Sequence, residues 1–196
     1  GSSVMTRAGR QTVNRVLGSL PRSGIRRLTD YVMGNPDLGD AIQLGFGQPQ
    51  EPADERIREA IIRGMDLRKL RYTENAGTRE LREAIVAKLK IRNQIDTDIE
   101  SVFVTPGATY GVAITVGCLI DPGDEVLVPD PGYPNFAAAV CHYGGVAKFY
   151  SLREEACFLP DLDELESQIT PATKAIIVNS PGNPTGAVFG ADEVSR

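Results

Sequence analysis

Short apolar runs alternate with stretches of helical spacing from residue 101 to residue 178, and this alternation constrains the fold more than any other feature. The apolar runs predict strands at residues 101–104, 125–128, 146–150 and 175–178. The stretches between them predict helices at residues 107–119, 135–143 and 162–168. Strands that alternate with helices form a mainly parallel sheet with helices on its faces. The sequence therefore predicts an α/β protein with three layers.

The N-terminal part of the chain shows no such alternation. Residues 1–51 are rich in Arg, Gly and Pro and predict an arm with one short helix at residues 23–33. Apolar side chains then recur at helical spacing and predict helices at residues 52–68 and 78–92. The apolar residues of the second helix are expected to be buried, namely Leu81, Ile85, Val86 and Leu89.

Composition and charge exclude several classes of function. With a net charge of −5, the chain lacks the clustered Lys and Arg that non-specific nucleic-acid binding requires. No apolar run approaches the roughly 18 residues of a membrane span, and the start of the chain lacks the apolar core of a signal peptide. The three cysteines have no CxxC spacing, so they predict neither a disulfide framework nor a metal site. We therefore expect a cytoplasmic protein that binds neither nucleic acid nor membranes.

The loop at residues 105–109 joins a predicted strand to a predicted helix and suits an anion. Gly107 and Ala108 are small, so backbone N–H groups can approach a ligand, and the hydroxyl of Thr109 adds a further donor. A phosphate would fit this loop. The alternative is that Thr105 only caps the helix, with Pro106 at its first position.

The loops after two later strands add an aromatic ring and an amide. Tyr133 lies between Pro131 and Pro134, which hold the backbone so that the ring points in one direction and can stack on a planar heterocycle. Asn183 follows the last predicted strand, and its amide can donate a hydrogen bond to an anionic or phenolic oxygen. A cis peptide bond is possible between Asn183 and Pro184. Taken singly, both stretches could also be ordinary turns.

The three loops together describe one kind of ligand. Ligands of open parallel sheets bind at the carboxyl ends of the strands, which is where these loops lie. A phosphate cradle, a stacking aromatic and an oxygen-binding amide suit a phosphorylated aromatic cofactor. Pyridoxal phosphate is the obvious candidate.

The chain resembles the N-terminal half of a class I/II, fold-type I aminotransferase from about residue 44 to residue 196. The resemblance depends on six segments in the order that the family has them. They are LGFGQP at 44–49, YTENAG at 72–77 with ELR at 80–82, TPGAT at 105–109, DPGDEV at 121–126, PGYP at 131–134 and NSPGNPTG at 179–186. The resemblance implies an N-terminal arm and small-domain segment at residues 1–51 and the first half of the large cofactor-binding domain at residues 52–196.

The resemblance also implies roles for residues in the three loops. Gly107, Ala108 and Thr109 would hold the phosphate of pyridoxal phosphate. Tyr133 would stack on the pyridine ring, and Asn183 would bind the 3-oxygen of that ring.

Two residues outside these loops imply a homodimer with shared sites. Tyr72 matches the tyrosine that in this family reaches the phosphate bound in the partner subunit. Gly47 matches the loop glycine whose backbone lies beside the substrate carboxylate. Gln48 and Gln50 depart from the family, in which many members have an acidic residue and a phenylalanine at those positions.

No catalytic residue of the family is expected in this chain. The Schiff-base lysine, the aspartate that pairs with the pyridine nitrogen and the arginine that binds the substrate carboxylate lie in the half that would follow Arg196. The lysines present lie in predicted helices or at strand edges and match none of these motifs; they are Lys69, Lys88, Lys90, Lys148 and Lys174. We therefore expect a truncated part of a longer enzyme, unable to catalyse by itself.

The resemblance implies transamination between an amino acid and a 2-oxo acid by the complete enzyme. A pyridoxal-phosphate-dependent lyase or cyclase of the same fold shares all six segments and stays open as an alternative. A non-catalytic module that keeps the cofactor site, or a general binder of phosphate ligands, also stays open.

Overall fold

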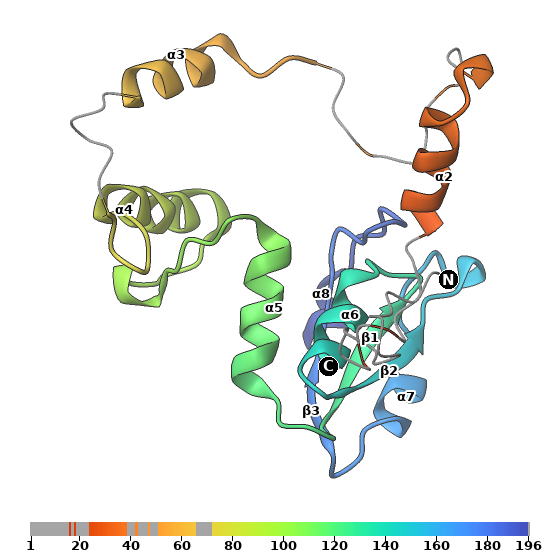
Figure 1. Cartoon of the computed structure of the whole chain (residues 1–196). Helices are drawn as coiled ribbons and strands as arrows, with labels where there is room; N and C mark the ends of the chain where they lie inside the picture. The colour runs from red at the N-terminus through yellow and green to blue at the C-terminus, as the bar shows by residue number, and fades with distance from the viewer. Residues whose placement is uncertain are drawn as a thin grey trace, which may run out of the picture. The chain divides into compact units, whose positions relative to one another are not determined.

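The computed structural model describes residues 16, 18, 24–38, 42, 47, 51–65 and 72–195. These residues fall into two compact units (Figure 1). One unit spans Gly24–Pro106, and the other combines Gly107–Arg196 with Gly1–Ser23. The predicted division of the chain at residue 51 stays a prediction.

The unit of Gly24–Pro106 is helical. Its elements are α2 (Gly24–Met33), a 3₁₀ turn (Pro36–Leu38), α3 (Glu55–Gly64), α4 (Arg79–Lys88), a π-helical turn (Leu89–Asn93) and a second 3₁₀ turn (Ile99–Ser101). All three predicted helices are present, while residues 66–68 of the second prediction lie outside the described residues. The side chain of Asp54 caps α3, and that of Thr78 caps α4, by accepting hydrogen bonds from the first turn.

The prediction that Leu81 is buried is wrong. Its side chain is 46% exposed, whereas Ile85, Val86 and Leu89 are half-buried. The residue that shares their face of the helix is Arg82, since it precedes them by three, four and seven positions. Leu81 precedes Arg82 by one position, so its side chain leaves the helix beside the buried face and not within it.

The predicted strand at residues 101–104 is also wrong. Residues 99–101 form a 3₁₀ turn, and the residues after it pair with no strand in the part of the chain that the structure describes. Val102 has the extended backbone that its sequence favours, with φ of −110° and ψ of 120°. Val104 donates its N–H to the carbonyl of Ala76 at 2.9 Å. An extended segment becomes a strand only when a neighbouring strand supplies a ladder of hydrogen bonds. The single bond to Ala76 does not form such a ladder.

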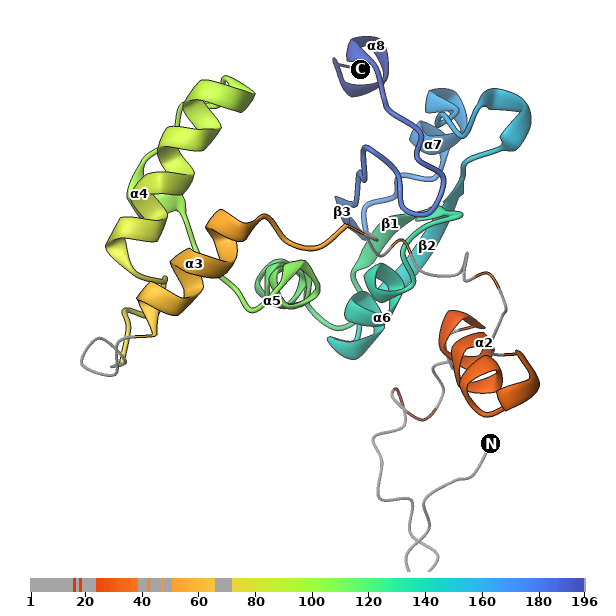
Figure 2. The same ribbon diagram turned by 90° about the horizontal axis from the view of Figure 1, so that it is seen from above.

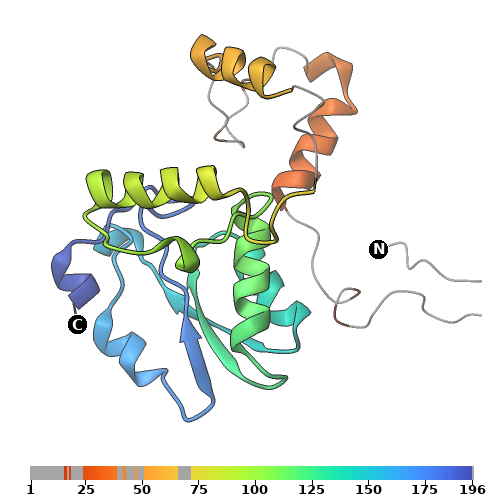
Figure 3. The same ribbon diagram turned by 90° about the vertical axis from the view of Figure 1, so that its left-hand side faces the viewer.

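Arg82 ties α4 to the chain that runs back alongside it (Figure 3). The guanidinium is buried and donates to the carbonyl of Val102 at 3.1 Å and to that of Ile99 at 2.6 Å. It also forms ion pairs with Glu74 at 3.1 Å and Glu100 at 3.5 Å. Because Glu74 lies in the loop before α4, one side chain connects three segments of this unit.

The unit of Gly107–Arg196 contains the parallel sheet that the sequence predicts. Its strands are β1 (Glu125–Asp130), β2 (Val146–Ser151) and β3 (Thr173–Ile176), in the order β2-β1-β3 and all parallel. Its helices are α5 (Ala108–Leu119), α6 (Asn135–His142), α7 (Leu162–Ser167) and α8 (Ala191–Ser195), with a 3₁₀ turn at Glu154–Ala156. The predicted helices and strands of this region are present, but β3 is shifted by two residues toward the N-terminus, so residues 177 and 178 of the predicted strand lie beyond its end.

The sheet is covered on both faces. Side chains alternate along β1, so that Val126 and Val128 pack with Val116 of α5 and Val140 of α6. Leu127 points to the opposite face, where a second cluster includes Leu165 of α7. Figure 2 shows α5 and α6 on one side of the strands and α7 on the other. The unit therefore has the three layers that the sequence predicts.

A polar cluster joins the amino ends of the strands. Oε2 of Glu125 accepts hydrogen bonds from Thr170 at 2.6 Å and from Lys148 at 3.2 Å. The bond from Thr170, followed by the bond and charge of Lys148, lowers the pKa of Glu125 against the opposing effect of desolvation.

None of the described helices is long and apolar enough to cross a membrane.

We predict that Arg82→Met destabilises the protein by about 1–3 kcal/mol, because it removes the guanidinium that donates to the buried carbonyl of Val102. Arg79→Met is the matched control, since Arg79 lies on the same helix and forms an exposed pair with Glu83. An exposed pair of this kind contributes up to about 0.5 kcal/mol. Urea denaturation measures both free energies of unfolding. Equal losses in the two variants would contradict the role of Arg82.

We predict that Glu125 makes stability depend on pH in the acid range. A lowered pKa in the folded state stabilises the protein above the unfolded carboxyl pKa of about 4.3, and this contribution is lost as the pH falls through the folded value. Glu125→Gln should therefore be less stable than the parent at pH 7, with the difference shrinking toward pH 3. Thermal denaturation of both proteins between pH 7 and pH 3 measures this difference in stability. Glu166→Gln, an exposed change on α7, should show no such trend.

Candidate functional site

The N-terminus of α5 offers backbone donors to a ligand. Gly107 precedes the helix with φ of 92°, in the left-handed region that residues with a Cβ avoid. Apart from its chain neighbours, no described atom lies within 4 Å of the place that a Cβ would take there. Gly107 is the N-cap residue and has no side chain with which to cap the helix, and the first turn has no acidic residue. The N–H groups of that turn, at the positive end of the helix dipole, can therefore bind an anion.

A tight turn carries the chain from β1 to Tyr133. The Asp130–Pro131 peptide bond is cis, and Gly132 follows it. A Cβ at Gly132 would lie 2.2 Å from the carbonyl oxygen of Pro129, closer than real contacts allow. Glycine is therefore required for the turn that brings Tyr133 to the carboxyl end of β1.

Two residues of α6 hold the Tyr133 ring in one orientation. Nδ2 of Asn135 donates a hydrogen bond of 2.8 Å to the Tyr133 hydroxyl. Phe136 packs edge to face against the ring, with centroids 5.5 Å apart and planes at 83°. Both residues belong to the first turn of α6, so the helix that follows the tyrosine holds the ring, in addition to the two prolines that the sequence analysis considered.

The structure brings Thr109 and Tyr133 together. Oγ1 of Thr109 and the hydroxyl oxygen of Tyr133 are 3.1 Å apart, at hydrogen-bond distance. Thr109 is exposed in the first turn of α5, and Tyr133 is half-buried. A residue predicted to bind phosphate and a residue predicted to stack on a ring therefore lie side by side at one helix end.

Asn183 lies in a turn that its neighbours close. Its backbone N–H donates to Oδ1 of Asn179 at 2.8 Å, and the N–H of Gly186 donates to the carbonyl of Gly182 at 2.7 Å. The Asn183–Pro184 peptide bond is cis, as the sequence allows. The side chain of Asn183 is exposed and forms no hydrogen bond to another described residue. Its predicted role at the ring oxygen stays a prediction.

Buried Tyr150 anchors the segment that leads into this turn. Its hydroxyl donates a hydrogen bond of 2.9 Å to the carbonyl of Ile177, directly after β3. Burial raises the pKa of Tyr150 to about 12, so the hydroxyl keeps its proton as a donor at neutral pH. The adjacent N–H of Ile177 donates to Leu127 of β1 at 2.9 Å. The base of the turn is thus attached to β1 through the backbone and to β2 through the Tyr150 side chain.

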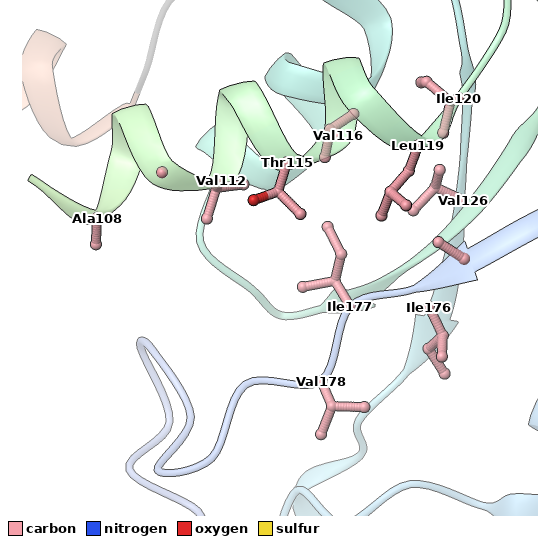
Figure 4. A pocket seen from close by; sticks show the side chains of 12 residues that line it. Ala108, Val112, Thr115, Val116, Leu119, Ile120, Val126, Ile176, Ile177 and Val178 are labelled. Atoms are coloured by element: carbon pink, nitrogen blue, oxygen red, sulfur yellow. The ribbon is translucent and has the colours of Figure 1, made fainter. Parts of the chain in front are cut away.

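An apolar cavity of about 450 Å³ lies between α5 and the segment around β3. Figure 4 shows Ile177 pointing toward α5 across it. Thr115 is the one polar side chain among the described residues that line it. Because a phosphate needs several donors, the cavity does not suit that group, and the predicted phosphate site at the start of α5 stays a prediction.

Tyr72 and Gly47 belong to the other unit. The Tyr72 side chain is fully exposed, and Gly47 is exposed as well. Their predicted roles in a shared dimer site stay predictions.

Lys148 of β2 contributes to the polar cluster at the amino ends of the strands. Nζ of Lys148 binds Glu125 and donates to the carbonyl of Gln168 at 2.8 Å. Glu125 begins β1, so Lys148 is bound at the opposite end of the strand from Tyr133. The prediction that Lys148 is not catalytic stays a prediction.

Two asparagines with a clear place at the site were not predicted. Asn179 could have been recognised, because an asparagine before a turn rich in Pro and Gly commonly accepts a hydrogen bond from the backbone a few residues later. Asn135 had no such signal. Its partner is a hydroxyl at the far end of a side chain, and only the packed ring brings the two groups together.

Comparisons with known proteins connect these features to one family. The sequence model described as aminotransferase class I and II matches residues 39–196. The chain belongs to the class I and II aminotransferases. The resemblance carried by the six segments is therefore confirmed.

Relatives of known description agree. An aspartate aminotransferase of Pyrococcus horikoshii is 39% identical over 170 residues, covering 87% of this chain and 43% of the relative. A probable aspartate/prephenate aminotransferase of Aquifex aeolicus is 36% identical over 157 residues, covering 80% of this chain and 40% of the relative. The chain thus spans less than half the length of these curated relatives.

Solved aminotransferase structures share the fold. Aspartate aminotransferase from Thermus thermophilus with maleate has a TM-score of 0.85 at 31% identity, covering 94% of this chain and 49% of that one. Alanine aminotransferase from Pyrococcus furiosus has a TM-score of 0.85 at 32% identity, covering 93% and 47%. The predicted α/β, fold-type I class is confirmed, and this chain matches about half the length of each of these solved chains.

We predict that Asn179→Ala loosens the turn of this aminotransferase chain that carries Asn183. Loss of the 2.8 Å bond to Asn179 removes about 0.5–1.5 kcal/mol of stabilisation from the turn. The backbone N–H of Asn183 should therefore exchange with solvent about 2- to 10-fold faster. Hydrogen exchange of that amide measures the effect. Asn179→Asp is the matched control because it keeps an acceptor oxygen, and it should exchange close to the parent rate. An unchanged rate in Asn179→Ala would contradict the assignment.

Proposed function

We propose that the complete protein containing this chain is a pyridoxal-phosphate-dependent aminotransferase that moves an amino group between an amino acid and a 2-oxo acid. The observation that carries the proposal is the N-terminus of α5, where open space beside Gly107 meets a hydroxyl held against Tyr133. Membership in the class I and II aminotransferases supports the same activity.

The residues at the start of α5 fit a phosphate group. A Cβ at Gly107 would project into unfilled space, so the missing side chain leaves room for ligand oxygens. Backbone N–H groups from Ala108 onward and the hydroxyl of Thr109 are all donors, which matches the acceptor oxygens of a phosphate. No acidic side chain in the first turn opposes the charge.

Tyr133 and Asn183 fit the ring of the same cofactor. The edge-to-face contact with Phe136 fixes the plane of Tyr133, so one ring face can stack on a pyridine ring. The exposed amide of Asn183 can donate to the 3-oxygen of that ring. We propose that Gly107, Ala108 and Thr109 bind the phosphate while these two side chains orient the ring.

The cofactor, when bound, supplies the electron sink that transamination needs at the substrate α-carbon. The residues of this chain hold the ring and phosphate so that the reacting carbon is presented in one position. Since the chain spans less than half the length of its relatives, we propose that the lysine that holds the cofactor comes from the remainder of the protein.

We further propose a cytoplasmic homodimer in which Tyr72 reaches the phosphate in the partner subunit. Tyr72 is fully exposed. Glu74, two residues after Tyr72, forms an ion pair with Arg82 at 3.1 Å, which connects the loop to α4. Gly47, exposed in the same unit, would place its backbone beside the substrate carboxylate.

We predict that Asn183→Ala in the complete protein weakens pyridoxal phosphate binding by about 10- to 100-fold. A hydrogen bond to a charged group contributes about 1.5–3 kcal/mol, which corresponds to that range. Equilibrium dialysis measures the dissociation constant, and amino-group transfer from an amino acid to a 2-oxo acid measures activity. Ser167→Ala, an exposed change on α7, is the control and should bind like the parent.

Three results would reject the proposal in different ways. A parent protein that does not bind pyridoxal phosphate would reject the cofactor site. Inorganic phosphate that competes as well as pyridoxal phosphate would indicate a general phosphate binder. Binding without amino-group transfer would indicate a lyase, a cyclase or a non-catalytic module.

A further inference from the structure

A short chain of hydrogen bonds leads from α6 to the N-terminus of α5. Nδ2 of Asn135 lies 2.8 Å from the hydroxyl oxygen of Tyr133, and that oxygen lies 3.1 Å from Oγ1 of Thr109. The two bonds connect a half-buried amide to an exposed hydroxyl on another helix. The direction of each bond decides what Thr109 can offer to a ligand.

The amide nitrogen of Asn135 settles the first direction. An amide NH₂ group only donates, so the Tyr133 oxygen is the acceptor in this bond. The phenolic group has a single proton. That proton is then free to be donated to the next acceptor, which is Oγ1 of Thr109.

In the second bond either oxygen can donate, and the Tyr133 proton left free by the first bond favours Tyr133 as the donor. When Thr109 accepts from Tyr133, its own hydroxyl proton does not point back at the tyrosine. It can point instead to an anion at the start of α5, next to the open space beside Gly107. Hydrogen bonds in such a chain polarise one another in the same sense, which strengthens the last donor.

The position of Asn135 makes this arrangement rigid. It is the first residue of α6, after Pro134, and its neighbour Phe136 is buried in the core. Phe136 also packs against the Tyr133 ring. The amide and the ring that it orients are therefore held by the same helical turn.

We propose that Asn135 is a positioning residue that directs the Thr109 hydroxyl toward the phosphate of the cofactor. This inference rests on the proposed pyridoxal phosphate site. It assigns to Asn135 no contact with the cofactor, because its effect passes through the hydroxyl of Tyr133.

The test compares two probes, pyridoxal phosphate and pyridoxal, which differ only in the phosphate group. Their dissociation constants are measured by equilibrium dialysis on the complete protein and its variants. Removal of one neutral hydrogen bond by Asn135→Ala should weaken pyridoxal phosphate binding by about 3- to 10-fold. Pyridoxal binding should change by less than about 2-fold, because the ring contacts remain.

Asn135→Asp is the sharper variant, since it keeps the size of the side chain and replaces the donor with an acceptor. The Tyr133 proton should then turn to the carboxylate, and Thr109 would donate to Tyr133 and no longer to the phosphate. We expect a loss for pyridoxal phosphate at least as large as that of Asn135→Ala. If Asn135→Ala does not fold, this variant carries the same comparison.

Tyr133→Phe provides the control for the route. It removes the hydroxyl through which Asn135 acts, so adding Asn135→Ala or Asn135→Asp to Tyr133→Phe should cause no further loss specific to the phosphate. Ser167→Ala should leave both dissociation constants unchanged.

Two results would overturn the inference while leaving the proposed function in place. One is an equal loss for pyridoxal phosphate and pyridoxal in the Asn135 variants, which would indicate only a displaced ring. The other is a phosphate-specific loss that persists in full in the Tyr133→Phe background. A parent protein that binds neither probe would overturn the proposed function and this inference together.

Discussion

β1 is buried between two apolar layers, and the loops of the candidate site depend on that burial. Val126 and Val128 pack against α5 and α6, while Leu127 packs on the opposite face. With both faces covered, the strand can neither slip by one residue nor turn over without exposing one of these layers. The polar ends of the strands are fixed as a result. Glu125 joins Lys148 and Thr170 at one end, and the Tyr133 turn leaves the other end.

The candidate site is built from short-range geometry at the ends of these elements. Gly107 leaves space where α5 begins, and Gly132 permits the turn into α6. The two helix ends meet through the hydroxyls of Thr109 and Tyr133. Backbone donors and an aromatic ring are thus brought together by two consecutive helices of one unit. This local chemistry and membership in the class I and II aminotransferases support the same proposal.

The sequence predicted elements well where the local pattern and the packing agree. The helix at α5 and the three parallel strands follow from apolar runs that end up in the core. The pattern was wrong at residues 101–104, where an extended backbone has no partner among the described strands. It was wrong at Leu81 as well, because the buried face of α4 is centred on Arg82. The guanidinium of Arg82 donates to carbonyl groups distant in sequence and pairs with Glu74 and Glu100.

The sequence by itself determined the family, the alternation of strands and helices, and which loops carry Thr109, Tyr133 and Asn183. These properties depend on residues close together in the chain, so spacing and residue type are enough to predict them. The tertiary structure alone decided that Asn135 donates to Tyr133 and that Tyr133 meets Thr109. The first contact depends on how the Tyr133 ring lies against α6, and the second joins residues 24 positions apart, so both distances exist only once the ring and the helices are packed.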